Sequence, residues 1–418
     1  MVCSMKLVRF DVEDLLEQFN LKERRMQSST NSSYPGGRIS RRQFVKAASV
    51  VALGAGALQG CAASGEDNGG DGSAIKMGVS IWSTQDSLGS QSWKIIQQAA
   101  DALGVEFQSV EQGLVSEQVV ASIETLCAGG CQGIVVCNSS DTEMTSAINT
   151  VNQNEVYLSQ FYRMISEQES PDVFQTAVNS SYFVGSVHED EQDNGYRLGK
   201  ILVDKGDRTI GLIGWTVGDA TFQQRWDGYK KAVEEWNGAH PDDQATLLEP
   251  IYANTSSTEA ANAVQALVNS NPSLDAIISA TGNDVLVGVT GQLKNLGLTG
   301  KIDVVSTDFM EDLAEQLESG GVLAQSGGHF CDALFSFLLT YNAVRGRYEV
   351  NQSEYGYEIK CPYIFVASPD DYRNYEKYFV TSSPYTDDEI RELADATFDE
   401  LRAAAVALSI DDVMKRHQ

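Results

Sequence analysis

The chain has 418 residues, which is enough for two lobes with separate hydrophobic cores. Its 58 Asp and Glu residues outnumber its 30 Lys and Arg residues, so the formal net charge is −28 at pH 7. A surface this acidic repels nucleic acid and anionic lipid headgroups, which excludes proteins that bind either, although acidity alone names no ligand.

Residues 38–61 have the pattern of a secretion signal. Arg41 and Arg42 lie in a positively charged stretch, and an apolar run follows at residues 47–60. This run of 14 residues is shorter than the roughly 20 residues that a membrane-spanning helix needs. The alternative interpretation, which we do not favour, is a buried apolar helix of a cytosolic protein.

Two short motifs in this segment resemble known export signals. Residues 40–46 (SRRQFVK) resemble the twin-arginine motif, and residues 58–61 (LQGC) resemble a bacterial lipobox. The second resemblance implies that Cys61 is acylated and becomes the mature N-terminus. We therefore expect residues 1–60 to be leader and signal peptide, with Met26 as a suitable start, and residues 61–73 to be a flexible Gly/Asp-rich tether. The protein is expected to be exported and lipid-anchored, in the periplasm or on the outer face of the cytoplasmic membrane.

From residue 75 onward, β-rich runs alternate with helical patterns. In the first block we expect strands at 75–82, 105–110, 133–137 and 156–161, and helices at 91–103, 116–128 and 142–153. After residues 182–188 the same alternation restarts. In the second block we expect strands at 209–213, 246–252, 276–279 and 303–307, and helices at 190–204, 222–236, 256–269 and 284–296.

The predicted strands are apolar without alternation, which is typical of parallel sheets covered on both faces. Two such blocks predict the α/β class, with two similar doubly wound parallel-sheet lobes joined by a hinge. Ligands of such sheets bind beyond the carboxyl ends of the strands. Polar or aromatic residues follow the predicted strands at 82–86, 138–141, 160–163, 215–216, 253–255, 281–284 and 307–308.

At these positions the chain resembles the type I periplasmic sugar-binding proteins of the ribose-binding group. The resemblance covers roughly residues 74–366. It rests on 134–141 (IVVCNSSD), the helix start at Glu189-Asp190, 223–229 (QQRWDGY), 280–284 (ATGND) and 304–308 (VVSTD). It implies a type I periplasmic binding protein fold. It also implies a solute-binding protein of an ABC transporter, with a sugar ligand and a membrane permease as partners, and neither cofactor nor catalytic activity.

The resemblance assigns candidate ligand-binding residues. Arg225, Asn283 and Asp308 match positions that hydrogen-bond sugar hydroxyls in the family, and His329 falls near its hinge-side Gln. Further candidates at the strand ends are Trp82, Gln85, Asp86, Gln160, Phe161 and Asn254. Gln160-Phe161 replaces the family's Asp-Arg, and residues 82–86 replace its Asn-Pro-Phe-Phe. Together with an insertion between Phe161 and Tyr182, these departures leave the identity of the ligand open.

Each candidate also has a structural interpretation. Arg225 could pair with Asp227 or Glu234 on a helix surface, and Asn283 could cap the helix that follows it. Trp82 and Phe161 could be core aromatics, and Asp86 could close a turn. Asp308 follows a buried strand, where an unpaired carboxylate is costly, so a ligand pocket is favoured there.

The resemblance sets the expected domain limits. We expect an N-terminal lobe of 74–187 with 328–361, a C-terminal lobe of 188–327 with 362–372, and a helical extension of 373–418. A helix starting near Thr386 carries an apolar stripe that should pack on its own lobe rather than on a partner. The stripe consists of Ile390, Leu393, Ala394, Phe398, Leu401, Ala405 and Leu408.

Other classes of protein fit the sequence less well. The four histidines form no metal-binding pair, and no G-x-S-x-G elbow occurs, so an enzyme is disfavoured. Small buried thiols or one disulfide are favoured over a metal site for Cys127, Cys131, Cys137, Cys331 and Cys361. A sensor that presents its ligand to a membrane receptor or kinase, and a binding protein for a nucleoside or autoinducer, remain alternatives.

Overall fold

The computed structural model describes residues 74–217, 220–350 and 353–418. The predicted export signal at Arg41 and Arg42, the lipidation site Cys61 and the tether 61–73 lie outside these residues. In the part of the chain that is described, no helix is both long enough and apolar enough to span a membrane.

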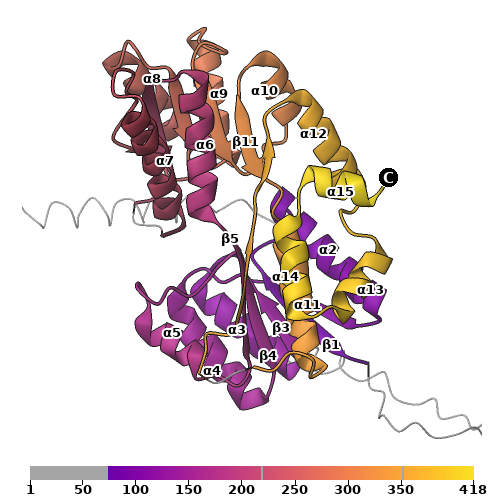
Figure 1. Ribbon diagram of the computed structural model, residues 1–418. Coiled ribbons are helices and arrows are strands. Elements are labelled where there is room, and N and C mark those ends of the chain that lie inside the picture. The colour runs from indigo at the N-terminus through magenta and orange to yellow at the C-terminus, as the bar shows by residue number, and fades with distance from the viewer. Residues whose placement is uncertain (1–73, 218–219, 351–352) are drawn as a thin grey trace, which may run out of the picture. The chain divides into compact units, whose positions relative to one another are not determined.

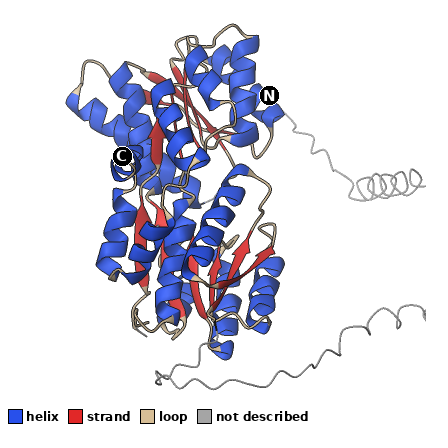
Figure 2. Cartoon of the chain, turned by 90° about the vertical axis from the view of Figure 1, so that its right-hand side faces the viewer, coloured by secondary structure: helices blue, strands red, loops and turns tan. Residues whose placement is uncertain are grey.

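Two parallel sheets organise the chain, and helices lie on both sides of each (Figures 1 and 2). The first sheet has the order β12-β5-β4-β3-β1-β2, and all its neighbours pair in parallel. Its strands are β1 (Lys76–Ile81), β2 (Glu106–Glu111), β3 (Gly133–Val136), β4 (Tyr157–Phe161), β5 (Phe183–Glu189) and β12 (Tyr357–Cys361). The accompanying helices are α2 (Ser87–Leu103), α3 (Ser116–Ala128), α4 (Met144–Asn154), α5 (Pro171–Val178) and α11 (Cys331–Val344).

The second sheet has the order β13-β11-β10-β9-β6-β7, and β8 also pairs with β6. Its strands are β6 (Thr209–Gly214), β7 (Thr246–Leu247), β8 (Ile251–Tyr252), β9 (Ala276–Ser279), β10 (Asp303–Thr307), β11 (Ala324–Gly327) and β13 (Ile364–Val366). The antiparallel β13 closes one edge. The accompanying helices are α6 (Glu191–Lys205), α7 (Ala220–Ala239), α8 (Ser257–Ser270), α9 (Asn283–Asn295) and α10 (Leu313–Ser319).

The two sheets share one strand order, in which the second strand of each block lies outside the first. This is a doubly wound α/β arrangement, so the predicted fold class is confirmed. The chain passes between the sheets at three places: after β5, after β11 and after β12. These crossings place Glu189, His329 and Cys361 at the junction of the two sheets.

Some predicted elements need correction. The helix expected at 91–103 begins at Ser87, because the Asp86 carboxylate accepts a hydrogen bond from the Gly89 amide at 2.9 Å and caps it. The strand expected at 246–252 is two short strands separated at Leu248–Pro250, where proline cannot donate to the ladder. The segment between Phe161 and Tyr182 contains α5, which the pattern of the sequence does not predict.

The predicted start of the C-terminal extension at 373 falls within α12 (Pro369–Tyr375), which a π-helical turn at Glu376–Thr381 follows. The extension continues with α13 (Asp387–Asp395), α14 (Phe398–Ala407) and α15 (Ile410–Arg416). The single helix expected after Thr386 is therefore wrong: Ala396 is extended, and Thr397 starts a new helix with a capping box to Glu400. The α13 and α14 helices contact α11 (Figure 1), and Ile390, Leu401 and Ala405 are buried in the main core.

Candidate functional site

A cavity of about 480 Å³ lies at the carboxyl ends of β1, β6, β10 and β11. We call it the aromatic cavity. It is lined by Trp82, Asp86, Ser87, Leu88, Gln91, Leu114, Trp215, Asp308, Phe309, Met310, Glu311, Gly328, His329, Tyr372, Tyr375 and Val380. Among these are four residues that the sequence nominated, Trp82, Asp86, Asp308 and His329, although they come from distant parts of the chain.

The backbone at Asp308 fixes one wall of the aromatic cavity. Asp308 has φ = 72°, a left-handed conformation that Asp tolerates better than most residues. Its amide donates to the Ser326 carbonyl at 2.7 Å, and the Thr281 hydroxyl donates to its carboxylate at 3.2 Å. The side chain remains 27% exposed, so a carboxylate with few protein partners faces the cavity.

Trp82 and Asp86 form the opposite wall as a bonded pair. The Trp82 indole Nε1 donates to Asp86 Oδ2 at 2.8 Å, while Asp86 Oδ1 caps α2. Because its single donor is occupied, Trp82 offers a ligand its ring rather than its polar edge. The ring of Tyr162 lies against it, with centroids 5.8 Å apart.

His329 lies at the base of the aromatic cavity, 6% exposed, with its ring against Tyr162 and Tyr363. Its Nε2 is 3.4 Å from Glu189 Oε1. Burial lowers the pKa of His329 to about 3 and raises the pKa of Glu189 well above its ordinary value. The imidazole of His329 is therefore neutral at neutral pH, and burial favours the protonated form of the Glu189 carboxyl.

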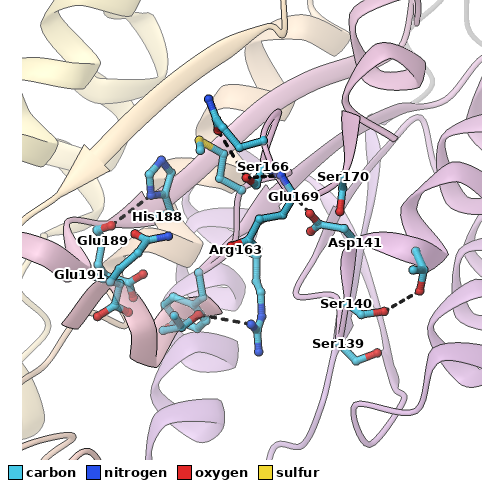
Figure 3. Close-up of a pocket in the computed structure, with 16 residues that line it drawn as sticks. Ser139, Ser140, Asp141, Arg163, Ser166, Glu169, Ser170, His188, Glu189 and Glu191 are labelled. Carbon is cyan, nitrogen blue, oxygen red and sulfur yellow. Dashed lines mark hydrogen bonds between the residues drawn. The ribbon is translucent and has the colours of Figure 1, made fainter. Parts of the chain in front are cut away.

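A second cavity, of about 500 Å³, lies at the ends of β3, β4 and β5; we call it the serine-rich cavity (Figure 3). It is lined by Ser139, Ser140, Asp141, Thr142, Tyr162, Arg163, Met164, Ser166, Gln168, Glu169, Ser170, His188, Glu189, Glu191, Thr221 and Gln224. Figure 3 shows Arg163 between Asp141 and Glu191. Glu189 lines this cavity and His329 lines the other, so their close pair is part of the wall between them.

Arg225 has a different environment from the one considered at sequence level. It is buried, and its guanidinium bonds Glu191 twice, at 2.5 and 3.0 Å, and also Tyr363 and the Ala280 carbonyl. Burial alone would lower the pKa of Arg225, but Glu191, Tyr363 and Asp308 together outweigh it, so the pKa is raised. The suggested surface pairing is thus replaced by a buried ion pair, and Arg225 lies outside the described lining of both cavities.

Gln85, Gln160, Phe161 and Asn254 are not among the described residues that line either cavity. Gln160 and Phe161 are fully buried; the Gln160 amide donates to Asn138 at 2.7 Å, and Phe161 is a core residue. Gln85 bonds the neighbouring Thr84, and the exposed Asn254 donates to Glu259. Asn283 is the first residue of α9, and its side chain is not described.

Sequence reasoning missed part of the aromatic cavity. Trp215 was noted at a strand end but not proposed as a ligand contact, and Phe309 directly follows Asp308. Tyr372 and Tyr375 lie in α12, beyond the segment that carries the family resemblance. Their spacing of three residues puts them on one helix face, which was the available signal.

Neither cavity provides a metal site, since the described residues contain no group of three or more His, Cys, Asp or Glu side chains suited to hold an ion. Cys127, Cys131, Cys137, Cys331 and Cys361 are free thiols. The site is therefore one of hydrogen-bonding and aromatic groups.

A family model described as a periplasmic binding protein domain matches residues 77–327. The chain belongs to this family. Its members are extracytoplasmic ligand-binding proteins and not enzymes, which confirms the prediction of a non-enzymatic binding protein. No curated protein sequence matches the chain.

Solved structures share the family fold at low sequence identity. A solute-binding protein from Actinobacillus succinogenes with bound D-allose has a TM-score of 0.59 at 16% identity, over 72% of this chain and 100% of that one. One from Bacillus halodurans with myo-inositol gives 0.58 at 18%, over 74% and 99%. A twin-arginine translocation pathway signal protein from Burkholderia phytofirmans gives 0.59 at 17%, over 80% and 98%.

Proposed function

We propose that this protein is an extracytoplasmic solute-binding lipoprotein. It captures a small sugar-like ligand in the aromatic cavity and delivers it to an ABC importer. The observation that carries the proposal is the convergence of Trp82, Asp86, Asp308 and His329 on one cavity of about 480 Å³.

The chemistry of this cavity suits a polyol. A sugar has hydroxyl groups along its edge and C–H groups on its faces. Carboxylates such as Asp308 and Asp86 accept hydrogen bonds from the edge, and rings such as Trp82 pack on the faces. Solved structures of the same fold hold D-allose and myo-inositol, which supports this ligand class.

The first test is thermal unfolding of the domain from Cys61 onward with sugars, polyols, nucleosides and amino acids. A ligand at a hundred times its Kd should stabilise the folded state by about 2.7 kcal/mol. Asp308→Ala should remove the shift, whereas Asp141→Ala, in the serine-rich cavity, should retain it. A shift seen only with nucleosides or amino acids would contradict the sugar assignment. Loss of the shift in Asp141→Ala but not in Asp308→Ala would place the ligand in the serine-rich cavity instead.

Attachment to a lipid at Cys61 is part of the proposal. Its support is the lipobox-like sequence, the twin-arginine-like sequence at Arg41-Arg42 and the extracytoplasmic nature of the family. Cells fed a labelled fatty acid should label the wild type and not Cys61→Ala. Replacing Arg41 and Arg42 by Lys should retain the precursor in the cytoplasm, and unchanged export would argue against this route.

Delivery to an importer can be measured separately. With the permease and ATPase in vesicles, the ligand-loaded protein should stimulate ATP hydrolysis, and the ligand-free protein should not. Equal stimulation by both forms, or none by either, would contradict delivery.

A further inference from the structure

The aromatic cavity has an excess of hydrogen-bond acceptors and negative charge. Asp86, Asp308 and Glu311 contribute carboxylates to its lining, and the described lining residues include neither lysine nor arginine. Arg225, the cation nominated by the sequence, is bonded to Glu191 and lies outside this lining. An occupant of the cavity therefore meets carboxylates that no lining cation of the described chain balances.

The imidazole of His329 does not supply the missing charge, because its burial keeps it neutral at physiological pH. Its Nδ1 is buried and has no hydrogen-bond partner among the described groups, although the ring lines the cavity. Leaving such an atom unpaired costs free energy. This atom is an independent sign that a polar ligand group belongs beside it.

Aromatic rings from separate segments surround these carboxylates. Trp82 follows β1, Trp215 follows β6, Phe309 follows β10, and Tyr375 comes from α12 of the C-terminal extension. The face of an aromatic ring attracts a cation within about 6 Å of its centre, and desolvation strengthens the attraction. Rings combined with carboxylates form an environment that favours an organic ammonium group.

Hydrogen-bond chemistry distinguishes an ammonium from a neutral sugar hydroxyl. A hydroxyl both donates and accepts, whereas a protonated amine donates three bonds and accepts none. The serine-rich cavity contains a cation, Arg163, beside its carboxylates. The aromatic cavity offers donors from Ser87, Gln91 and Tyr372, but its described charged groups are all carboxylates. An amine therefore balances the charge of the aromatic cavity, which another hydroxyl would not.

We propose that the solute bound in the aromatic cavity is an amino sugar, whose protonated amine lies among Asp86, Asp308 and the aromatic rings. This inference rests on the proposed function and narrows its ligand class. It also gives the C-terminal extension a part in specificity through Tyr375.

The test uses matched sugars that differ only in the group at carbon 2, which is a protonated amine in one sugar and neutral in the others. Glucosamine, N-acetylglucosamine and glucose, with the corresponding galactose and mannose sets, are titrated into the full mature chain by calorimetry. We expect at least one amine to bind about tenfold or more tightly than both of its neutral counterparts, as expected for a charge-assisted hydrogen bond.

Two variants locate the charge. Asp308→Asn retains a residue that tolerates a left-handed backbone, and Asp86→Asn retains the oxygen that caps α2 but loses the acceptor of the Trp82 indole N–H. Both should weaken amine binding about tenfold or more and leave neutral sugars nearly unchanged. Asp141→Asn, in the serine-rich cavity, is the matched control and should leave amine binding intact.

The outcomes separate this inference from the function on which it rests. Neutral sugars that bind as tightly as their amines would overturn the inference and leave a sugar-binding protein. Binding of choline or a polyamine, with no carbohydrate bound, would overturn the amino-sugar assignment together with the sugar-binding function. Amine binding that is unchanged in both Asn variants would overturn the assigned location.

Discussion

The two cavities differ in how their carboxylates are neutralised. In the wall of the serine-rich cavity, Glu191 is held by two bonds from Arg225, and burial raises the pKa of Glu189 and favours its protonated form. In the aromatic cavity, Asp308 receives one hydroxyl bond from Thr281 and stays partly exposed. Glu191, whose partners are already present, stabilises the fold, whereas Asp308 keeps acceptor capacity that a ligand can use.

The largest expected effect is the loss of Arg225. Arg225→Ala leaves Glu191 buried without its cation, and we expect the free energy of unfolding to fall by about 3–5 kcal/mol. Urea unfolding measures this loss. The double variant Arg225→Met with Glu191→Gln should recover much of it, because no charge is left buried. An Arg225→Ala variant as stable as the wild type would show that Glu191 does not depend on Arg225, and the contrast with Asp308 would fail.

The extension contributes to the lining of the aromatic cavity and not to that of the serine-rich cavity. We expect a somewhat smaller loss of stability when its packing is disturbed. Leu401 is fully buried in α14, and Leu401→Ala should lower the free energy of unfolding by about 2–5 kcal/mol. Val406→Ala, at a position that is 54% exposed on the same helix, should change it by less than about 0.5 kcal/mol. Equal effects of the two variants would mean that the extension does not pack as described.

Asp332 is a buried residue in the first turn of α11, three residues after His329. The pH dependence of stability tests whether its carboxyl is protonated. Burial raises its pKa to about 8, whereas the ordinary value is 3.8. A raised pKa stabilises the fold fully below the unfolded value, and this stability is lost as the pH rises toward 8. Between pH 5 and 8 the wild type should lose at least about 1 kcal/mol more than Asp332→Asn. Urea unfolding at both values measures the difference, and parallel losses would contradict a protonated Asp332.

The smallest effect concerns Asp86. Asp86→Ala removes the cap of α2 and should reduce the free energy of unfolding by about 1 kcal/mol. Asp86→Asn retains the capping oxygen but loses the acceptor of the Trp82 indole N–H, so it should lose less than Asp86→Ala. Thermal unfolding of both variants tests whether the charge in the aromatic cavity is dispensable for folding. A large loss in Asp86→Asn would show that the carboxylate serves the fold.

The alternating apolar strands and amphipathic helices made the fold predictable, because buried parallel strands are continuous apolar runs such as 134–136. Element ends were less predictable. The start of α2 depends on a local hydrogen bond of Asp86, and the break between α13 and α14 depends on the Thr397 cap. These interactions are visible in the sequence only as residue types that also occur in turns.

The site was predictable to the extent that strand order determines it. Asp308 and Trp82 follow strands of different sheets and line the same cavity, as expected for the carboxyl ends of doubly wound sheets. The burial of Arg225 with Glu191 and the contribution of Tyr375 were not predictable, because both depend on side-chain packing between distant segments. The residues next to Arg225 or Tyr375 in the sequence do not show which distant side chains will pack against them.

Because the chain crosses between the sheets, the two sheets can form their strand pairings at different times during synthesis. The Ser159 hydroxyl on β4 bonds Ser336 on α11 at 2.7 Å, across 177 residues of sequence, and β5 pairs with β12. The strands β6 to β11, in contrast, come from one uninterrupted stretch. During synthesis the second sheet can therefore form most of its pairings while the first still lacks an edge strand and a covering helix. The sheet that is made first therefore waits for segments made near the end of synthesis, and part of its apolar surface stays uncovered until the ribosome has passed residue 361.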